Sequence, residues 1–170
     1  MTLFKQIRAI FALPFNVLIT IPTILYFYLN NDLIIQTLPL AGNLIRYSLA
    51  VLFFLFGLFL AMTTILAFHK IGKGTLAPWD PPEKLVVVGM YRYVRNPMLT
   101  GIMFLLTSET LFLFTISQLC WTLFFISAAV IIMPLYEEKK LIERFGKEYI
   151  RYKSQVPRWI PSNKPYNQDK

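Results

Sequence analysis

Long stretches without charge dominate the chain. Residues 9–31 and 47–68 contain no Asp, Glu, Lys or Arg, which leaves 23 and 22 consecutive uncharged positions. Residues 96–136 form a stretch of 41 positions whose single charge is Glu109. Because a helix needs roughly 20 apolar residues to cross a hydrocarbon core of ~30 Å, we expect one crossing in each of the first two stretches and two in the third, joined by a tight turn near Ser117. The pattern predicts an all-α, polytopic membrane protein with about four transmembrane helices.

A different pattern begins at Glu137, where charged residues become frequent. Apolar residues recur there at spacings of four, four, three and four, with charged residues between them: Leu141, Phe145, Tyr149, Tyr152 and Val156. This spacing predicts a C-terminal amphipathic helix that lies along the membrane surface or covers the loops. We expect Gly146 to weaken or break the helix, Pro157 and Pro161 to end it, and the residues from about 162 onward to form a frayed polar tail.

The net charge of +8 follows the loops. Lys and Arg precede the first stretch, recur between residues 70 and 95 and follow Glu137, whereas residues 30–45 and the turn near Ser117 contain none. This alternation is typical of the positive-inside rule and predicts that both termini are cytoplasmic. The partner of the basic residues is then the bilayer, and we expect no nucleic-acid binding. Arg46, which departs from the alternation, is interpreted as an interfacial or snorkelling side chain.

The composition divides the chain near residue 68. Residues 1–68 read as an N-terminal transmembrane hairpin, and residues 69–170 as a loop, a second hairpin and the amphipathic helix. Polar groups gather at one predicted membrane face, in the loop with Gly72 and Gly74, in residues 89–101 and at residues 137–138. This gathering suits a cofactor site, although ordinary loop residues and a solvated helix end would give the same pattern. The single cysteine, Cys120, reads as a packing residue, and no metal site is predicted.

Two segments then identify a family resemblance. Residues 89–98 read GMYRYVRNPM, and residues 137–161 place Glu-Glu, Phe-Gly, two tyrosines, Val-Pro and Ile-Pro in a fixed order. Together they resemble the membrane-embedded isoprenylcysteine carboxyl methyltransferase and phospholipid methyltransferase families over roughly residues 70–161. The resemblance implies an enzyme, a methyltransferase that uses S-adenosylmethionine as its cofactor.

The resemblance also implies which residues bind that cofactor. The expected cofactor-binding residues are Lys84, Leu85, Val86, Tyr91, Arg95, Asn96, Pro97, Glu137 and Glu138. Gly72 and Gly74 are the loosest match. A carboxylate such as Glu137 can accept hydrogen bonds from the cofactor's ammonium or ribose hydroxyls, and Arg92 or Arg95 can bind its carboxylate. The two glutamates could instead be solvated, and the arginines could anchor the chain to lipid phosphate.

The methyl acceptor is expected to be a lipophilic molecule that arrives from the bilayer. The isoprenylcysteine branch has a substrate-binding arginine four residues before the matched glutamate, and this chain has Met133 there. That difference disfavours a prenylcysteine-like carboxylate, and the Asn in Arg95-Asn96-Pro97, where the isoprenylcysteine branch has His, favours the phospholipid-like branch. Arg92 and Glu109 are candidate acceptor-binding residues, although Glu109 lies roughly 18 Å of helix beyond Pro97 and can equally be a structural acid. No single catalytic residue is assigned, because in-line methyl transfer depends mainly on alignment.

Two other functions fit parts of the pattern. Sterol reductases carry a related C-terminal pattern but use NADPH, whose extra phosphates would require more basic contacts. A non-enzymatic membrane scaffold or small transporter would use the amphipathic helix as a binding surface. Neither alternative accounts for both motif segments together.

Overall fold

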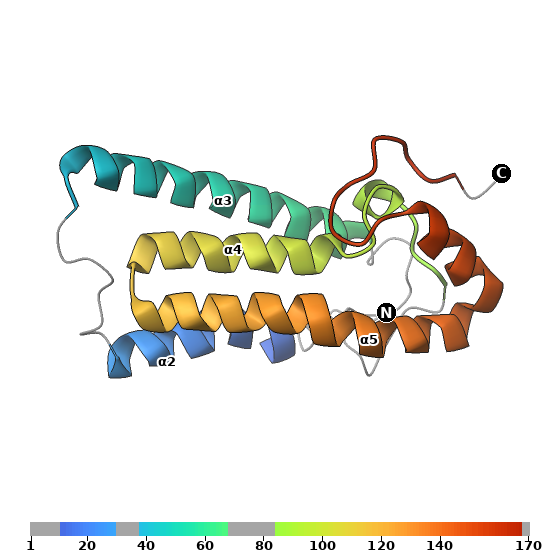
Figure 1. The fold of residues 1–170 in the computed structure, drawn as a ribbon, viewed down its shortest axis with the longest axis horizontal. Coiled ribbons are helices and arrows are strands. Elements are labelled where there is room, and N and C mark those ends of the chain that lie inside the picture. Colours follow the sequence, from blue (N-terminus) through green and yellow to red (C-terminus); the bar gives the residue numbers. More distant parts are fainter. Residues whose placement is uncertain (1–10, 30–37, 68–83, 168–170) are drawn as a thin grey trace.

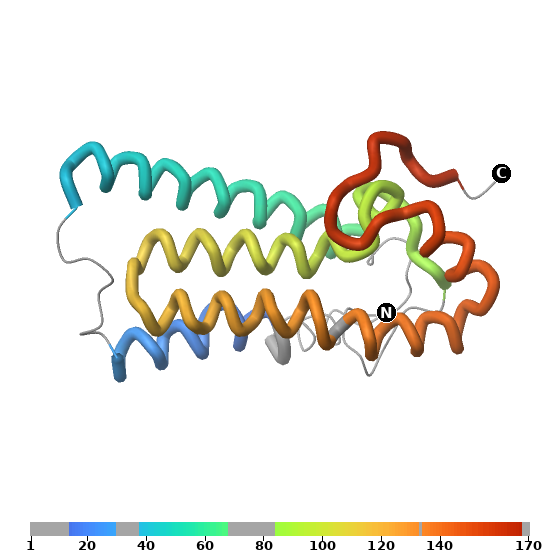
Figure 2. Tube along the Cα trace, viewed as in Figure 1, coloured from blue at the N-terminus to red at the C-terminus, as the bar shows by residue number. Residues whose placement is uncertain are grey.

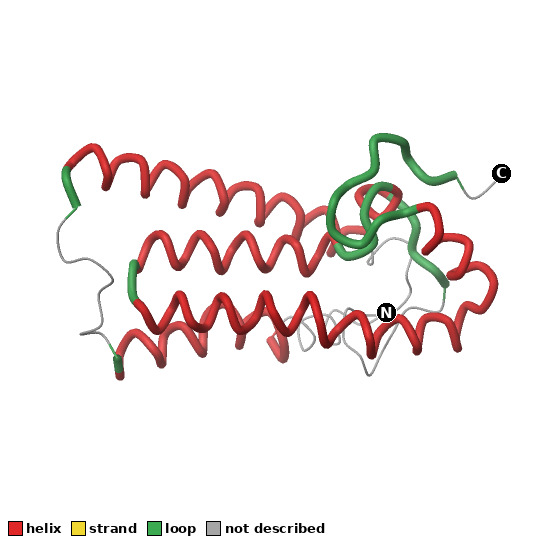
Figure 3. The backbone as a smooth tube through the Cα atoms, viewed as in Figure 1, coloured by secondary structure: helices red, strands yellow, loops and turns green. Residues whose placement is uncertain are grey.

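The computed structural model describes residues 11–29, 38–67 and 84–167, which fold into helices joined by loops (Figures 1 and 3). In chain order these are a π-helix η1 (Phe11–Thr20), α2 (Ile21–Tyr28), α3 (Leu40–Ala67), a short 3-10 helix η3 (Gly89–Arg92), α4 (Pro97–Leu113) and α5 (Ile116–Gln155). No strand occurs within these ranges, so the predicted all-helical fold is confirmed for them. The predicted boundary at residue 68 and the loop with His69, Gly72 and Gly74 lie outside the described residues.

Two of the described helices are long and apolar enough to cross a membrane. They are α3, with 28 residues, and α5, with 40. A 40-residue helix is roughly 60 Å long, about twice the hydrocarbon thickness. Because charges begin at Glu137, the part of α5 suited to the bilayer is residues 116–136. Pro14–Tyr28 and Pro97–Leu113 are apolar but shorter, so the four-helix crossing stays a prediction.

Helix α4 lies between α3 and α5 (Figure 1). The elements η1 and α2 follow each other directly and together form the first helix, which lies beside α5. The α3–α4 contact is close because glycines face each other across it. A Cβ atom added at Gly57 would lie 2.8 Å from the carbonyl oxygen of Gly101, and one added at Gly101 would lie 3.1 Å from the oxygen of Gly57. Small residues that let two backbones approach in this way are typical of helix packing in membranes. Ser108 adds a hydrogen bond across the contact, donating to the Ala50 oxygen at 2.7 Å.

The first helix is fastened to α5 through a backbone group that a proline leaves free. In the π-helical pattern of η1, the Val17 carbonyl would accept a hydrogen bond from the N–H of residue 22. That residue is Pro22, which has no N–H. Trp121 of α5 donates its indole Nε1–H to the Val17 oxygen at 3.1 Å instead. Proline and tryptophan together therefore specify where the first helix docks.

The turn between α4 and α5 lies at Phe114 and Thr115, close to the predicted position near Ser117. Phe114 adopts a left-handed conformation (φ 57°, ψ 44°), and Thr115 caps α5 by accepting from the Gln118 N–H. Arg46 of α3 donates to the carbonyls of Leu111 at 2.6 Å and Phe112 at 3.1 Å. The guanidinium of Arg46 therefore caps the carboxyl end of α4, and its interpretation as an interfacial or snorkelling side chain stays a prediction.

Helix α5 continues past the apolar part and bends at Gly146 (φ 53°, ψ −128°), as predicted from the glycine. The expected apolar stripe also forms. Tyr149, Tyr152 and Val156 are buried against Val87 of the loop that precedes α4. The helix ends at Gln155, before Pro157, which confirms the predicted end. The bent part of α5 therefore covers the loop at one end of the bundle.

Candidate functional site

The motif segments meet at one end of the bundle, where three parts of the chain come together. These are the loop and 3-10 helix of residues 84–96, α5 from Glu137 through its bend, and the C-terminal residues 156–167 (Figure 2). We call this assembly the motif cluster. The motif cluster begins where the apolar part of α5, residues 116–136, ends. Its polar backbone groups and side chains therefore border the apolar helices.

The C-terminal segment is paired with the loop rather than frayed. The Arg95 N–H donates to the Pro157 oxygen at 2.9 Å, and the Ser162 N–H donates to the Tyr93 oxygen at 2.9 Å. The Tyr166 N–H donates to the Arg92 oxygen at 2.8 Å, and the Tyr166 side chain is only 7% exposed. The expectation of a frayed tail from about residue 162 is therefore wrong up to residue 167. The tail buries one aromatic ring and uses the loop as its backbone partner.

Glu138 is surrounded by three basic side chains. Its Oε1 accepts from Arg95 Nη1 at 2.6 Å and from Arg158 Nε at 3.0 Å, and its Oε2 lies 2.5 Å from Lys153 Nζ. The side chains of Glu138 and Arg95 are 13% and 10% exposed. Burial opposes ionisation of Glu138, but the hydrogen bonds from Lys153 and Arg158 and the charge of Arg95 outweigh it and hold the pKa below its ordinary value of 4.5. The structure thus brings Glu138 and Arg95 together, bonded to each other.

Glu137 differs from its neighbour. Its side chain is exposed, and among the described residues it makes no ion pair. Desolvation of the carboxyl group where it borders other residues, together with the negative charge of Glu138, raises its pKa above the ordinary value. Of the two predicted glutamates, Glu137 is therefore the one that can accept hydrogen bonds from a ligand.

Tyr91, which belongs to η3, lies close to Glu137 of α5. Its backbone oxygen accepts from the hydroxyl of Tyr152 at 2.6 Å. Burial raises the pKa of the Tyr91 phenol, and the charges of Tyr152 and Glu137 raise it further. The phenol consequently stays protonated and lies within the electrostatic reach of Glu137. Two residues expected to contact the cofactor are brought together here.

The remaining predicted residues take different places in the same loop. Lys84 is exposed, Leu85 packs against the Tyr149 and Tyr152 core, and Val86 is buried. Asn96 and Pro97 form the start of α4, with Pro97 buried at the first helical position. Proline suits that position because its missing N–H needs no partner there.

The side chains of the two predicted acceptor-binding residues form hydrogen bonds with other groups of the protein. Arg92 donates through Nε to the Tyr166 oxygen at 2.9 Å and through Nη2 to the side chain of Asn167. Glu109 lies near the far end of α4 from Pro97 and accepts from Gln118 Nε2 at 3.1 Å. The expected separation of Glu109 from the motif cluster is therefore present in the structure.

Sequence reasoning missed three contributors to the motif cluster. Lys153 and Arg158 read as members of the positive-inside excess, and Tyr166 sits in a polar segment with no periodicity. The proline pair Pro157 and Pro161 was the one available signal, because it fixes where the chain leaves α5 and turns back.

A comparison with protein-family models gives a match. The model of the phospholipid methyltransferase family matches residues 45–148, which run from the first turns of α3 to just beyond the Gly146 bend. A comparison with curated proteins finds no match. The matched range covers more than half of the 170 residues and includes both Tyr91 and Glu137. The chain therefore belongs to the phospholipid methyltransferase family.

Proposed function

We propose that this protein transfers a methyl group from S-adenosylmethionine to a lipophilic acceptor that arrives from the bilayer. The observation that carries the proposal is the position of Glu137, which makes no ion pair among the described residues and stands beside Tyr91 where the apolar part of α5 ends. Family membership supports methyl transfer, and the two long apolar helices support a membrane location for it.

The residues present fit the cofactor in part. The Glu137 carboxylate is the acceptor for its ammonium or ribose hydroxyls, and Tyr91 offers an aromatic face. Arg95, expected to bind the cofactor's carboxylate, already donates to Glu138 and to the Val156 oxygen. We therefore assign Arg95 and Glu138 a positioning role, in which they fix the end of α5 and hence the direction of the Glu137 side chain.

The chemistry requires alignment and exclusion of water. S-adenosylmethionine supplies an electrophilic methyl group on a positively charged sulfur when it is bound. With the cofactor bound, an acceptor lone pair would form the new bond to the methyl carbon as the carbon–sulfur bond breaks, and the demethylated cofactor would leave as a neutral thioether. An acceptor that starts as an ammonium would first release its proton to solvent water. The apolar helix ends beside the motif cluster keep the site poor in water, and the paired tail and loop hold its walls in place.

We propose a phospholipid-like amine as the acceptor class. Met133 stands one helical turn before Glu137 on α5, where a carboxylate substrate would need a cationic partner. An amine needs no such partner. In the proposed arrangement the three apolar stretches make four crossings of the bilayer, and both termini and the motif cluster face the cytoplasm.

The test is calorimetric titration of detergent-purified protein with S-adenosylmethionine. Glu137→Gln removes the charge of the proposed ligand-binding carboxylate, and Glu143→Gln removes an exposed charge from the same helix as a matched control. We expect at least about tenfold weaker binding for Glu137→Gln, since charged hydrogen bonds are the stronger ones, and unchanged binding for Glu143→Gln. Absence of binding by well-folded unmodified protein would exclude the proposed activity. Binding would be followed by transfer of labelled methyl groups to bilayers with and without aminophospholipid.

A further inference from the structure

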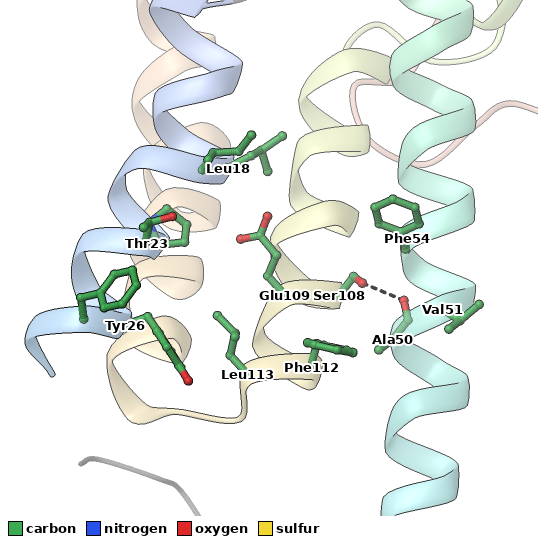
Figure 4. A pocket seen from close by; sticks show the side chains of 13 residues that line it. Leu18, Thr23, Tyr26, Ala50, Val51, Phe54, Ser108, Glu109, Phe112 and Leu113 are labelled. Carbon is green, nitrogen blue, oxygen red and sulfur yellow. Dashed lines mark hydrogen bonds between the residues drawn. The ribbon is translucent and has the colours of Figure 1, made fainter. Parts of the chain in front are cut away.

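A cavity lies at the other end of α4 from the motif cluster. Its volume is about 550 Å³, within the range of small-molecule sites. Residues of the first helix and of α3 form its sides, and the last turns of α4 form its floor (Figure 4). The side chains around it are mainly apolar, and two of them, Phe54 and Phe112, are 49% and 63% exposed. The cavity is therefore open to the surroundings of the bundle, which in the proposed four-span arrangement are the bilayer.

One acidic side chain faces the cavity. Glu109 projects from α4 into the ring of lining residues (Figure 4). Its Oε2 accepts from Gln118 Nε2 at 3.1 Å, and no described residue donates to its other carboxylate oxygen. Gln118 is 1% exposed, so the donor that orients this carboxylate is itself buried. The hydroxyl of the neighbouring Ser108 is already used by the Ala50 oxygen.

This combination defines the chemistry of an occupant. Apolar walls open to the bilayer favour a hydrocarbon body, and a carboxylate with a free acceptor position favours a cationic or hydrogen-bond-donating head. A carboxylate facing hydrocarbon is costly without such a partner. A fatty acid would place a second carboxylate against Glu109, and a plain hydrocarbon would leave the acceptor unpaired. Charge complementarity therefore selects an amine.

We propose that the Glu109 cavity is a binding site for a single-chain, long-chain amine, with its ammonium on Glu109 and its chain between the first helix and α3. The site is distinct from the proposed methyl-transfer site. Pro97 begins α4 beside the motif cluster and Glu109 lies twelve residues later, which is roughly 18 Å along the helix. Neither Arg95 nor Glu138 contributes to it. The site therefore binds its amine whether or not the chain transfers methyl groups.

The experiment is a binding titration of the full-length protein in nanodiscs of zwitterionic lipid. The probe is a sixteen-carbon primary amine bearing a photoactivatable group on its chain, with the alcohol and the carboxylic acid of equal length as competitors, each at about the same membrane concentration. Crosslinked positions are identified by peptide mass spectrometry. We expect crosslinks in residues 18–27 and 108–113, and competition that is at least about tenfold stronger for unlabelled amine than for the alcohol.

Two variants separate the carboxylate from the cavity. Glu109→Gln keeps the size of the side chain and should reduce the preference for amine over alcohol to about one. Thr23→Trp leaves Glu109 intact and fills space at the cavity wall, so it should lower crosslinking by the amine probe at residues 18–27 and 108–113. Circular dichroism and the S-adenosylmethionine titration establish that each variant is folded and that the motif cluster is unaffected.

Specific results would overturn the proposal. Equal competition by amine and alcohol in the unmodified protein would remove the role of Glu109. Crosslinks confined to residues 84–98 and 137–158 would mean that the amine binds only at the proposed methyl-transfer site. Loss of S-adenosylmethionine binding with retained amine binding at residues 108–113 would contradict the proposed function and leave this site standing. Competition by aminophospholipid that equals the single-chain amine would assign the cavity to diacyl lipids instead.

Discussion

Replacing Glu138 with Gln should destabilise the protein, whereas the same change at Glu137 should leave its stability nearly unchanged. Glu138 holds three cations, and the amide would keep the shape of the side chain while removing its charge. Arg95, which is 10% exposed, would lose its ionic partner in a poorly solvated place, whereas Arg158 and Lys153, at 30% and 39% exposed, can turn to water. Glu137 makes no ion pair among the described residues, so its replacement leaves no buried cation without a partner.

The magnitude follows from these exposures. A hydrogen bond to a charged group contributes about 1.5–3 kcal/mol, and the buried Arg95 contact should lose about 2 kcal/mol of that. The two more exposed contacts are screened by solvent, and together they should add about 1 kcal/mol or less. The free energy of unfolding should therefore fall by about 2–3 kcal/mol in Glu138→Gln. For a chain of this length that corresponds to a decrease in Tm of roughly 5–10 °C.

Thermal unfolding in detergent, followed by tryptophan fluorescence and circular dichroism, measures the difference. Glu143→Gln is the control for removing one negative charge from α5. Replacing Arg95 and Glu138 together with Met and Leu should recover part of the lost stability, because no buried charge then lacks a partner. A decrease in Tm that is equal for Glu137→Gln and Glu138→Gln would refute the division of roles between the two glutamates.

Three other measurements test the fold. The pKa of Glu138 lies below its ordinary value of 4.5. Its contribution to the free energy of unfolding is therefore full above pH 4.5 and is lost as the pH falls through the lowered pKa. The Tm of the unmodified protein should consequently decrease more steeply with acid than the Tm of Glu138→Gln. Tyr166→Ala removes a buried ring that packs edge-to-face on Tyr152 at 5.4 Å, and should cost about 2–4 kcal/mol and raise amide hydrogen exchange in residues 160–167. Gly57→Ala forces a Cβ atom to 2.8 Å from a backbone oxygen of α4 and should cost about 1–3 kcal/mol, whereas Gly42→Ala, whose nearest contact is 3.6 Å, should be neutral or stabilising.

Opposite outcomes would identify which contact is wrongly assigned. If the Tm of the unmodified protein and the Tm of Glu138→Gln decreased in parallel as the pH falls, the loss of stability in acid would not come from protonation of Glu138. A Tyr166→Ala variant with unchanged amide exchange would mean that the tail does not depend on that ring. A tolerated Gly57→Ala would mean that α3 and α4 do not approach as closely as described.

Much of the helical framework follows from the sequence itself. Uninterrupted apolar stretches, the tyrosine stripe after Glu137, the bend at Gly146 and the stop before Pro157 are local properties. They depend on residue period, on backbone freedom at glycine and on the missing N–H of proline, each of which acts within a few residues. The family motif likewise lies in the sequence, and it located the end of the bundle where the chemistry is proposed.

The partners of individual polar groups were decided by the tertiary structure. Arg46 caps α4 from a position 65 residues earlier in the chain, and Arg95 meets Glu138 across 43 residues. The family resemblance matched Glu137, but residue patterns alone could not show that Glu137 makes no ion pair among the described residues while Glu138 is enclosed by three cations. Tyr166 has no periodic neighbours, so its burial depends on the reversal of the chain after Pro157. Short-range patterns specify which residues avoid water, but the position of a charge relative to its partner depends on how the helices pack, because electrostatic and hydrogen-bond energies change over a few ångströms.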